Sequence, residues 1–212
     1  MNIYLDCDEV LLNTAIAHVF FLKKHYDVSV DPHVYPSCWT FQDEKIRSYE
    51  VSTSLFTRSK EFSEVNPVPF AKEGIDTLKK QKHKLFVVTS ISDCEEVKKS
   101  RRKNLETVFG PVFENITCLP LGHSNKKKYY ETVKPGIVID DSFHNILSAL
   151  ECGHIPVFVS IRQNQEWLDI VKQKNILTIT SLKSFAEILP SIQMRHDQTN
   201  MFFFKSRYCE RE

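Results

Sequence analysis

Three short apolar runs in the sequence each end in side chains that could act on a phosphoryl group. The runs cover residues 2–5, 84–88 and 136–139. The residues that follow them are Asp6-Cys7-Asp8, Thr89-Ser90 and Asp140-Asp141. A run of lysines, 126–128, precedes the third. Carboxylates, a hydroxyl and a lysine around a divalent cation supply the charge neutralisation and positioning that phosphoryl transfer needs.

The elements that must position these residues follow from the alternation along the chain. Strands are expected at 2–6, 84–89, 116–119, 136–140, 156–160 and 176–179. Helices are expected at 13–26, 71–81, 93–109, 125–132, 144–151, 164–174 and 182–189. Short apolar strands that alternate with helices indicate an α/β fold, with a Rossmann-like parallel sheet and helices on both faces. In such a sheet the carboxyl ends of the strands form the ligand-binding edge.

The position of each of these residues after its strand suggests a role for it. Asp6, nearest the strand end, can attack phosphorus and form an aspartyl-phosphate. Asp8, two residues on, can protonate the leaving alcohol and then deprotonate the hydrolytic water. Thr89, with Ser90 beside it, can hydrogen-bond the phosphoryl oxygens. Asp140 is expected to bind a metal ion directly, and Asp141 to orient that inner set of ligands.

The acidic side chains predict Mg²⁺ as the cofactor. Several carboxylates at one sheet edge repel each other unless a cation neutralises them, and all-oxygen ligands without His or Cys suit Mg²⁺. Taken singly, each of these residues has a commoner structural role as a helix cap, a turn or a solvated helix face. Because the required types follow three apolar runs together, the joint pattern favours the functional interpretation.

The same residues resemble the four motifs of the haloacid dehalogenase (HAD) superfamily. The matching segments are Asp6-Cys-Asp8-Glu-Val-Leu, Val88-Thr89-Ser90, a helix-opening lysine and Ile139-Asp140-Asp141-Ser142. The resemblance implies Mg²⁺ dependence and an aspartyl-phosphate intermediate, with the metal on Asp6, the Asp8 backbone carbonyl and Asp140. Lys126 fits the family lysine best, with Lys127 and Lys128 as alternatives. Glu9 stands where the superfamily usually has Gly.

The segment between the first two motifs suggests a substrate class. Core residues are expected at 1–27 and 68–189, a small helical cap at 28–67 and a tail at 190–212. This cap, with the run 62–71 and Phe109-Gly-Pro111-Val-Phe113, resembles the 5'(3')-deoxyribonucleotidase family. Three cap aromatics could stack on a nucleobase or could form the cap's own core. They are Trp39, Phe41 and Phe62.

The composition limits the kinds of partner that the protein is expected to bind. The 212 residues carry a net charge of +1, which argues against a stable nucleic-acid partner, although residues 79–103 hold a local excess of basic side chains. We interpret that excess as the solvated faces of two helices. The 6 cysteines include no CxxC pair, and no membrane-length apolar run occurs, so we expect free thiols and a cytoplasmic protein without a membrane partner. A monomer and a homodimer both stay open.

The sequence therefore predicts a Mg²⁺-dependent phosphomonoesterase that acts on a small phosphorylated substrate, foremost a (deoxy)ribonucleoside monophosphate. One alternative is the same chemistry on a sugar phosphate or a nucleic-acid 3'-phosphate. Another is a HAD-shaped binding module without turnover, which the retention of both Asp6 and Asp8 disfavours.

Overall fold

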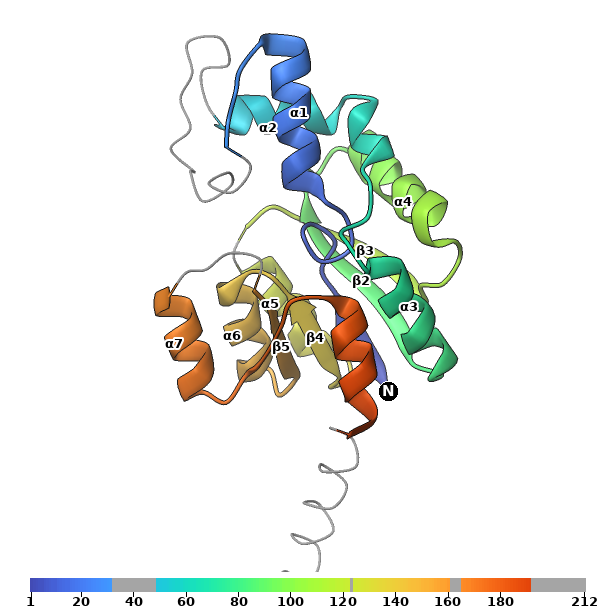
Figure 1. Ribbon diagram of the computed structural model, residues 1–212, viewed down its shortest axis with the longest axis vertical. Coiled ribbons are helices and arrows are strands. Elements are labelled where there is room, and N and C mark those ends of the chain that lie inside the picture. Colours follow the sequence, from blue (N-terminus) through green and yellow to red (C-terminus); the bar gives the residue numbers. More distant parts are fainter. Residues whose placement is uncertain (32–48, 123, 161–164, 192–212) are drawn as a thin grey trace, which may run out of the picture.

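The computed structural model describes residues 1–31, 49–122, 124–160 and 165–191 (Figure 1). Its centre is a six-stranded sheet with the order β3-β2-β1-β4-β5-β6, and every neighbouring pair is parallel. The strands are β1 (Asn2–Leu5), β2 (Lys84–Ile91), β3 (Asn115–Pro120), β4 (Ile137–Asp140), β5 (Ile155–Val159) and β6 (Leu177–Ile179). The predicted fold class is confirmed.

The apolar strands are buried because helices cover both faces of the sheet. On one face α3 (Ala71–Lys80), α4 (Glu95–Phe109) and the helix over 182–191 share a core with Leu5, Val87 and Ile139. On the other face α5 (Asn125–Thr132) and α6 (Phe143–Glu151) pack near Tyr4, Val88 and Val138. The helix α7 (Gln165–Gln173) packs beside α6. Neighbouring strand residues thus alternate between two apolar environments, as parallel sheets require.

Close approach of β1 and β4 explains why β4 begins after a glycine. A Cβ added to Gly136 would lie 2.5 Å from the carbonyl oxygen of Asn2, well inside van der Waals contact. The absence of a side chain lets the two strands pair from Ile3 and Ile137 onward. This pairing carries Asp6 and Asp140 to the same sheet edge.

Three elements rise above that edge and pack on one another (Figure 1). They are α1 (Thr14–Tyr26), α2 (Tyr49–Thr57) and the short 3₁₀ helix η1 (Glu61–Glu64). Phe21 of α1, Phe56 of α2 and Phe62 of η1 are all buried in one apolar cluster. The cap boundaries of 28 and 67 stay a prediction, and residues 32–48 lie outside the described part.

The cysteines within the described ranges are Cys7, Cys94, Cys118 and Cys152, and all of them are free thiols. Cys38 and Cys209 fall outside those ranges. In the parts of the chain that the structure describes, no helix combines the length and apolar character needed to cross a membrane.

Candidate active site

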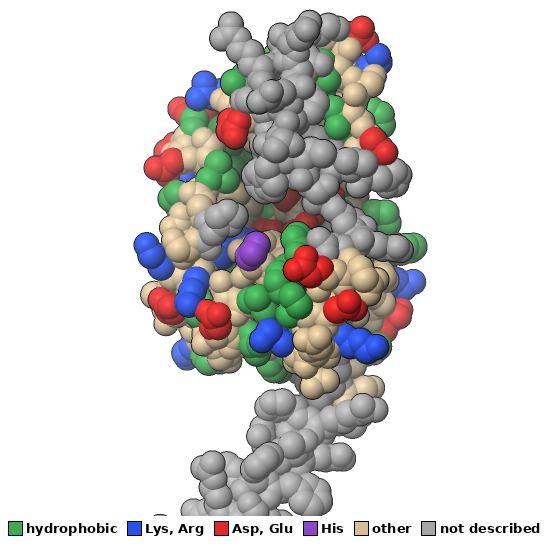
Figure 2. Space-filling view, turned by 90° about the vertical axis from the view of Figure 1, so that its left-hand side faces the viewer, with side chains coloured by type: hydrophobic (Ala, Val, Ile, Leu, Met, Phe, Trp, Pro, Cys, Tyr) green, Lys and Arg blue, Asp and Glu red, His purple; other side chains and the backbone are tan. Residues whose placement is uncertain are grey.

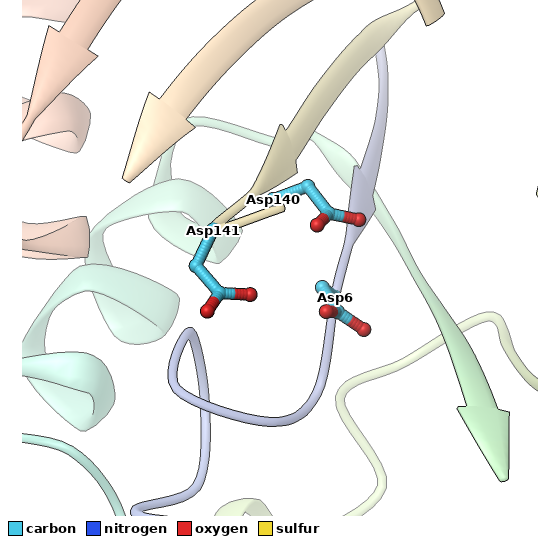
Figure 3. A group of neighbouring side chains, drawn as sticks. All are labelled: Asp6, Asp140 and Asp141. Carbon is cyan, nitrogen blue, oxygen red and sulfur yellow. The ribbon is translucent and has the colours of Figure 1, made fainter. Parts of the chain in front are cut away.

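Three carboxylates converge where β1 and β4 end. One oxygen each from Asp6, Asp140 and Asp141 lie within 4.8 Å of one another. Figure 3 shows Asp6 on the loop after β1 facing the two aspartates at the end of β4. The sequence predicted this convergence from the parallel order of the strands. Figure 2 shows acidic side chains inside a recess at mid-height on one face of the molecule.

Lys126 lies between two of these carboxylates. Its Nζ is 2.8 Å from Asp6 Oδ1 and 2.7 Å from Asp140 Oδ2. The side chains of Lys126 and Asp140 are 3% and 0% exposed. Lys126 lies in the first turn of α5 and reaches the carboxylates from the face of the sheet that α5 covers. Tyr130, one turn further along α5, is buried against the same face. Of the three candidate lysines, Lys126 is therefore the one in the cluster.

The neighbouring lysines point elsewhere. Lys127 Nζ pairs with Glu151 Oε2 at 2.6 Å on the surface, and Lys128 is exposed. A helix turns by about 100° per residue, so consecutive lysines cannot share one direction. Only the tertiary position of α5 distinguishes them.

Asp140 is fixed by more than the lysine. The backbone N–H of Ser142 donates to Asp140 Oδ1 at 2.8 Å, and Asn145 Nδ2 donates to Oδ1 and Oδ2 at 3.1 Å each. Asn145 lies in the first turn of α6 and was not singled out from the sequence. These contacts hold the Asp140 carboxylate in one orientation without extra positive charge.

The electrostatics of the cluster show an excess of negative charge. Burial, and then the Asp140 carboxylate, raise the pKa of Asp6 to about 7. Burial and the charge of Asp6 also raise the pKa of Asp141 well above its usual range. Burial alone would lower the pKa of Lys126, but Asp140 and Asp6 raise it well above its usual value. One ammonium group thus does not balance three carboxylates, and a hard divalent cation fits the all-oxygen donor set.

The loop after β1 turns sharply at Glu9, whose φ is +62°. This left-handed conformation favours glycine, the residue usual at this position in the motif that the sequence resembles. Glu9 keeps the same turn and uses its side chain: Oε1 accepts a hydrogen bond from the Ala15 backbone N–H at 2.7 Å, at the start of α1. Glu9 in place of glycine therefore keeps the turn of the loop, and its side chain caps the start of α1.

Asp8 is held by a different set of contacts from the three-carboxylate group, although its charge also acts on Asp6. Thr14 Oγ1 donates a hydrogen bond to Asp8 Oδ1, and Arg101 Nη2 donates to the same oxygen at 2.8 Å. The Asp8 side chain is 36% exposed, so the carboxylate is anchored yet open to solvent.

Thr89 and Ser90 take opposite faces of β2. Alternation places Thr89 on the face of Val87, which is buried with Leu5, and Ser90 on the face of Val88, which is buried with Tyr130. Thr89 is 0% exposed, and its Oγ1 has no hydrogen-bond partner among the described residues. Ser90 is partly exposed and shares its face with α5. Both remain predicted phosphate ligands.

The cap aromatics divide into two groups. Trp39 and Phe41 lie outside the described residues. Phe62 is 1% exposed, meets the Phe56 ring edge-on and carries the Arg101 guanidinium on its face. Its ring therefore has no open face for a nucleobase, and the expectation that Phe62 stacks on substrate gives way to the core role.

Sequence reasoning missed Arg101 because it lies in a strongly basic stretch. A local signal was present: Val97, Arg101, Asn104 and Leu105 recur at helical spacing, and all four are buried. An arginine within the apolar stripe of a helix is unusual, since charged residues are almost never fully buried without a partner.

The sequence matches no protein-family model and no curated protein. Solved structures do resemble it. The L-2-haloacid dehalogenase from Xanthobacter autotrophicus, with chloropropionic acid covalently bound, has a TM-score of 0.60 at 10% identity, over 89% of this chain and 98% of that one. A haloacid dehalogenase-like family hydrolase from Streptococcus pneumoniae has a TM-score of 0.61 at 17% identity, over 88% and 97%.

A third similar structure is that of a phosphatase. The D,D-heptose 1,7-bisphosphate phosphatase from B. bronchiseptica, complexed with magnesium and phosphate, has a TM-score of 0.51 at 16% identity, over 90% of this chain and 98% of that one. The three matches span 88–90% of this chain and 97–98% of those proteins. The chain thus has the fold of the haloacid dehalogenase-like hydrolases.

Proposed function

We propose that the protein is a Mg²⁺-dependent phosphomonoester hydrolase that works through an aspartyl-phosphate on Asp6, with (deoxy)ribonucleoside monophosphates as substrates. The observation that carries the proposal is the contact of Lys126 with both Asp6 and Asp140 beside Asp141. Such a group is costly to bury for stability alone, because each ion loses its hydration. A site that binds and transfers phosphate would account for the burial of this charged group.

The metal would be held by Asp6, Asp140 and the backbone carbonyl of Asp8, with Asp141 orienting that set. Bound Mg²⁺ would neutralise charge on the phosphate and the carboxylates, which lowers the barrier to attack by an anion. The deficit of positive charge around Asp6 supports this assignment.

The chain's own residues account for the two chemical steps. The Asp6 carboxylate attacks phosphorus, the bond from phosphorus to the ester oxygen breaks, and Asp8 gives its proton to the departing alkoxide. Asp8 then takes a proton from water, the water oxygen attacks phosphorus, and the acyl-phosphate bond breaks. Inorganic phosphate leaves and Asp6 is restored. Lys126 stays charged throughout, and its Nζ lies 2.8 Å from Asp6 Oδ1.

The position of Asp8 favours a phosphate ester over a halide. A halide departs as a stable anion and needs no proton, whereas an alkoxide must be protonated as it leaves. Asp8 is two residues from Asp6, anchored at one oxygen and partly exposed. A proton donor held at this place suits an alcohol leaving group.

The nucleotide assignment depends on the resemblance of the insertion to the deoxyribonucleotidase cap. Trp39 and Phe41 are the proposed base-stacking residues, in a cap proposed to cover 28–67. A sugar phosphate or a nucleic-acid 3'-phosphate is the alternative substrate.

A panel of phosphate esters tests this function. The purified protein with Mg²⁺ is expected to release phosphate from nucleoside monophosphates faster than from sugar phosphates or 3'-phosphorylated oligonucleotides. Asp6→Asn should reduce turnover at least 100-fold while the circular dichroism spectrum is unchanged, because an amide cannot form the phosphoenzyme. Undiminished turnover by Asp6→Asn would falsify the mechanism. A sugar phosphate as the best substrate would move the proposal to the alternative class.

A further inference from the structure

Arg101 is a fully buried cation beside the active-site loop. It lies in the middle of α4, and its side chain is 0% exposed. Its guanidinium lies 4.2 Å from the ring centroid of Phe62, a residue of η1. The side chain therefore reaches from a helix that covers the sheet to the elements above it and to the loop that carries Asp8.

The contacts of Arg101 converge on one oxygen. Nη2 donates to Asp8 Oδ1 at 2.8 Å and lies 3.5 Å from Thr14 Oγ1, which itself donates to Asp8 Oδ1. Two donors on Oδ1 restrict rotation of the carboxylate. They come from segments 87 residues apart in the sequence, so the tertiary fold and not the loop alone fixes Asp8.

Stability alone does not explain an arginine here. Nε and Nη1 are buried and have no hydrogen-bond partner among the described residues. A buried charge with incomplete partners costs free energy, and apolar residues of similar volume often replace buried ion pairs without loss. The same helix face already presents Val97 and Leu105 to the core. The arginine thus serves something that an apolar side chain could not.

The groups around Arg101 are themselves held by contacts with neighbouring elements. Asn104, one turn further on, donates from Nδ2 to the Val65 carbonyl oxygen at 3.0 Å, which ties α4 to the segment after η1. The Phe62 ring lies under the guanidinium and is itself held by Phe56. A side chain fixed on both sides can hold its partner in a defined orientation.

We propose that Arg101 is a positioning residue for proton transfer: it fixes the Asp8 carboxylate through Oδ1 so that the other oxygen is presented to the leaving group. The inference rests on the proposed phosphatase function and adds a residue to it. Arg101 would touch neither substrate nor metal and would act through Asp8.

Substrates with different leaving groups can reveal this role. An alkyl phosphate must receive a proton as its alkoxide departs, whereas p-nitrophenolate leaves readily without one. The value of kcat/KM reports the steps up to the first irreversible one, which is formation of the phosphoenzyme. A loss of acid positioning therefore reduces kcat/KM for the alkyl phosphate more than for p-nitrophenyl phosphate.

The variants are Arg101→Met, which keeps the length without the charge, and Arg101→Lys, which keeps the charge and one donor. We expect Arg101→Met to reduce kcat/KM for a nucleoside 5'-monophosphate about 10-fold more than for p-nitrophenyl phosphate, which is less than the roughly 100- to 10,000-fold that a general acid contributes, because Asp8 itself is retained. Arg101→Lys should recover part of the difference. Arg102→Met, the adjacent and partly exposed residue of α4, is the matched control and should leave the ratio unchanged.

Combining Arg101→Met with Asp8→Asn tests whether Arg101 acts through Asp8. In the Asp8→Asn variant, Arg101→Met should change the ratio of the two substrates by less than 2-fold, since no acid remains to be positioned. In the protein that retains Asp8, an equal loss on both substrates by Arg101→Met and by Arg101→Lys would show a merely structural role and overturn the inference. If the wild-type protein turns over neither substrate, the proposed function itself fails, which is a different result.

Discussion

Lys126 shows how one side chain differs from its neighbours through its surroundings alone. The first of three consecutive lysines, it is buried between Asp6 and Asp140, while Lys127 pairs with Glu151 in solvent. Burial makes the Lys126 contacts sensitive to the loss of either partner, since an unpaired buried charge is far costlier than an exposed one. The two lysines thus form a matched pair for experiment.

Lys126→Met is expected to abolish phosphatase activity and to destabilise the fold by about 3–5 kcal/mol at neutral pH, the usual cost of breaking a buried ion pair. Lys127→Met should change both little. Phosphate release and denaturant unfolding of the two variants, measured beside the wild type, check this. Similar behaviour of both variants would contradict the assignment of Lys126.

At the scale of elements, α1 and α2 meet through a buried histidine. His18 of α1 stacks on Phe56 of α2 with ring centroids 4.6 Å apart and an interplanar angle of 6°. Burial lowers the pKa of His18 to about 4, against a hydrogen bond with the Ser52 backbone that raises it. The neutral imidazole therefore belongs to the folded state, and protonation favours the unfolded chain.

The sign of the pH effect follows from this shift. The unfolded chain binds a proton at His18 near pH 6.5 and the folded protein only near pH 4. His18 therefore contributes stability that is complete above pH 6.5 and is lost as the pH falls to about 4, on the order of 3 kcal/mol in total. His18→Gln should flatten the pH dependence of the unfolding free energy in that window. His144→Gln, at an exposed position, should retain it. Equal slopes for the wild type and His18→Gln would contradict the prediction.

At the scale of the whole molecule, the sheet brings together carboxylates that repel one another. Asp6 and Asp140 are separated by most of the chain, yet the β1–β4 pairing places them at one edge, with Asp141 beside them. The folded state concentrates this negative charge, and the unfolded chain disperses it. A cation that binds the folded state stabilises it by mass action.

Mg²⁺ is therefore expected to raise the melting temperature of the wild-type protein in a concentration-dependent way, and EDTA should reverse the rise. At 100 times the dissociation constant the stabilisation is about 2.7 kcal/mol. Asp140→Asn should weaken the shift, while NaCl at matched ionic strength should not reproduce it. A melting temperature that does not respond to Mg²⁺ would count against a metal at this site.

The sequence by itself determined the parallel sheet, the succession of strands and helices along the chain, and the edge at which chemistry-bearing residues gather. Apolar runs of strand length and periodic helices are local patterns, and parallel strands have one common carboxyl edge, so Asp6 and Asp140 could be expected to meet. Expected strand limits differ little from those observed, although β2 continues to Ile91 beyond the predicted Thr89.

Only the tertiary structure decided which of the charged side chains are buried and what they contact. It selected Lys126 among three lysines, moved Phe62 into the core and brought Arg101 to Asp8 across 93 residues. The physical reason is that burial and pairing depend on how helices lie against the sheet, which periodicity along one helix does not specify. Basic residues in one run of the sequence are therefore exposed or buried according to which face of their helix packs against the rest of the protein.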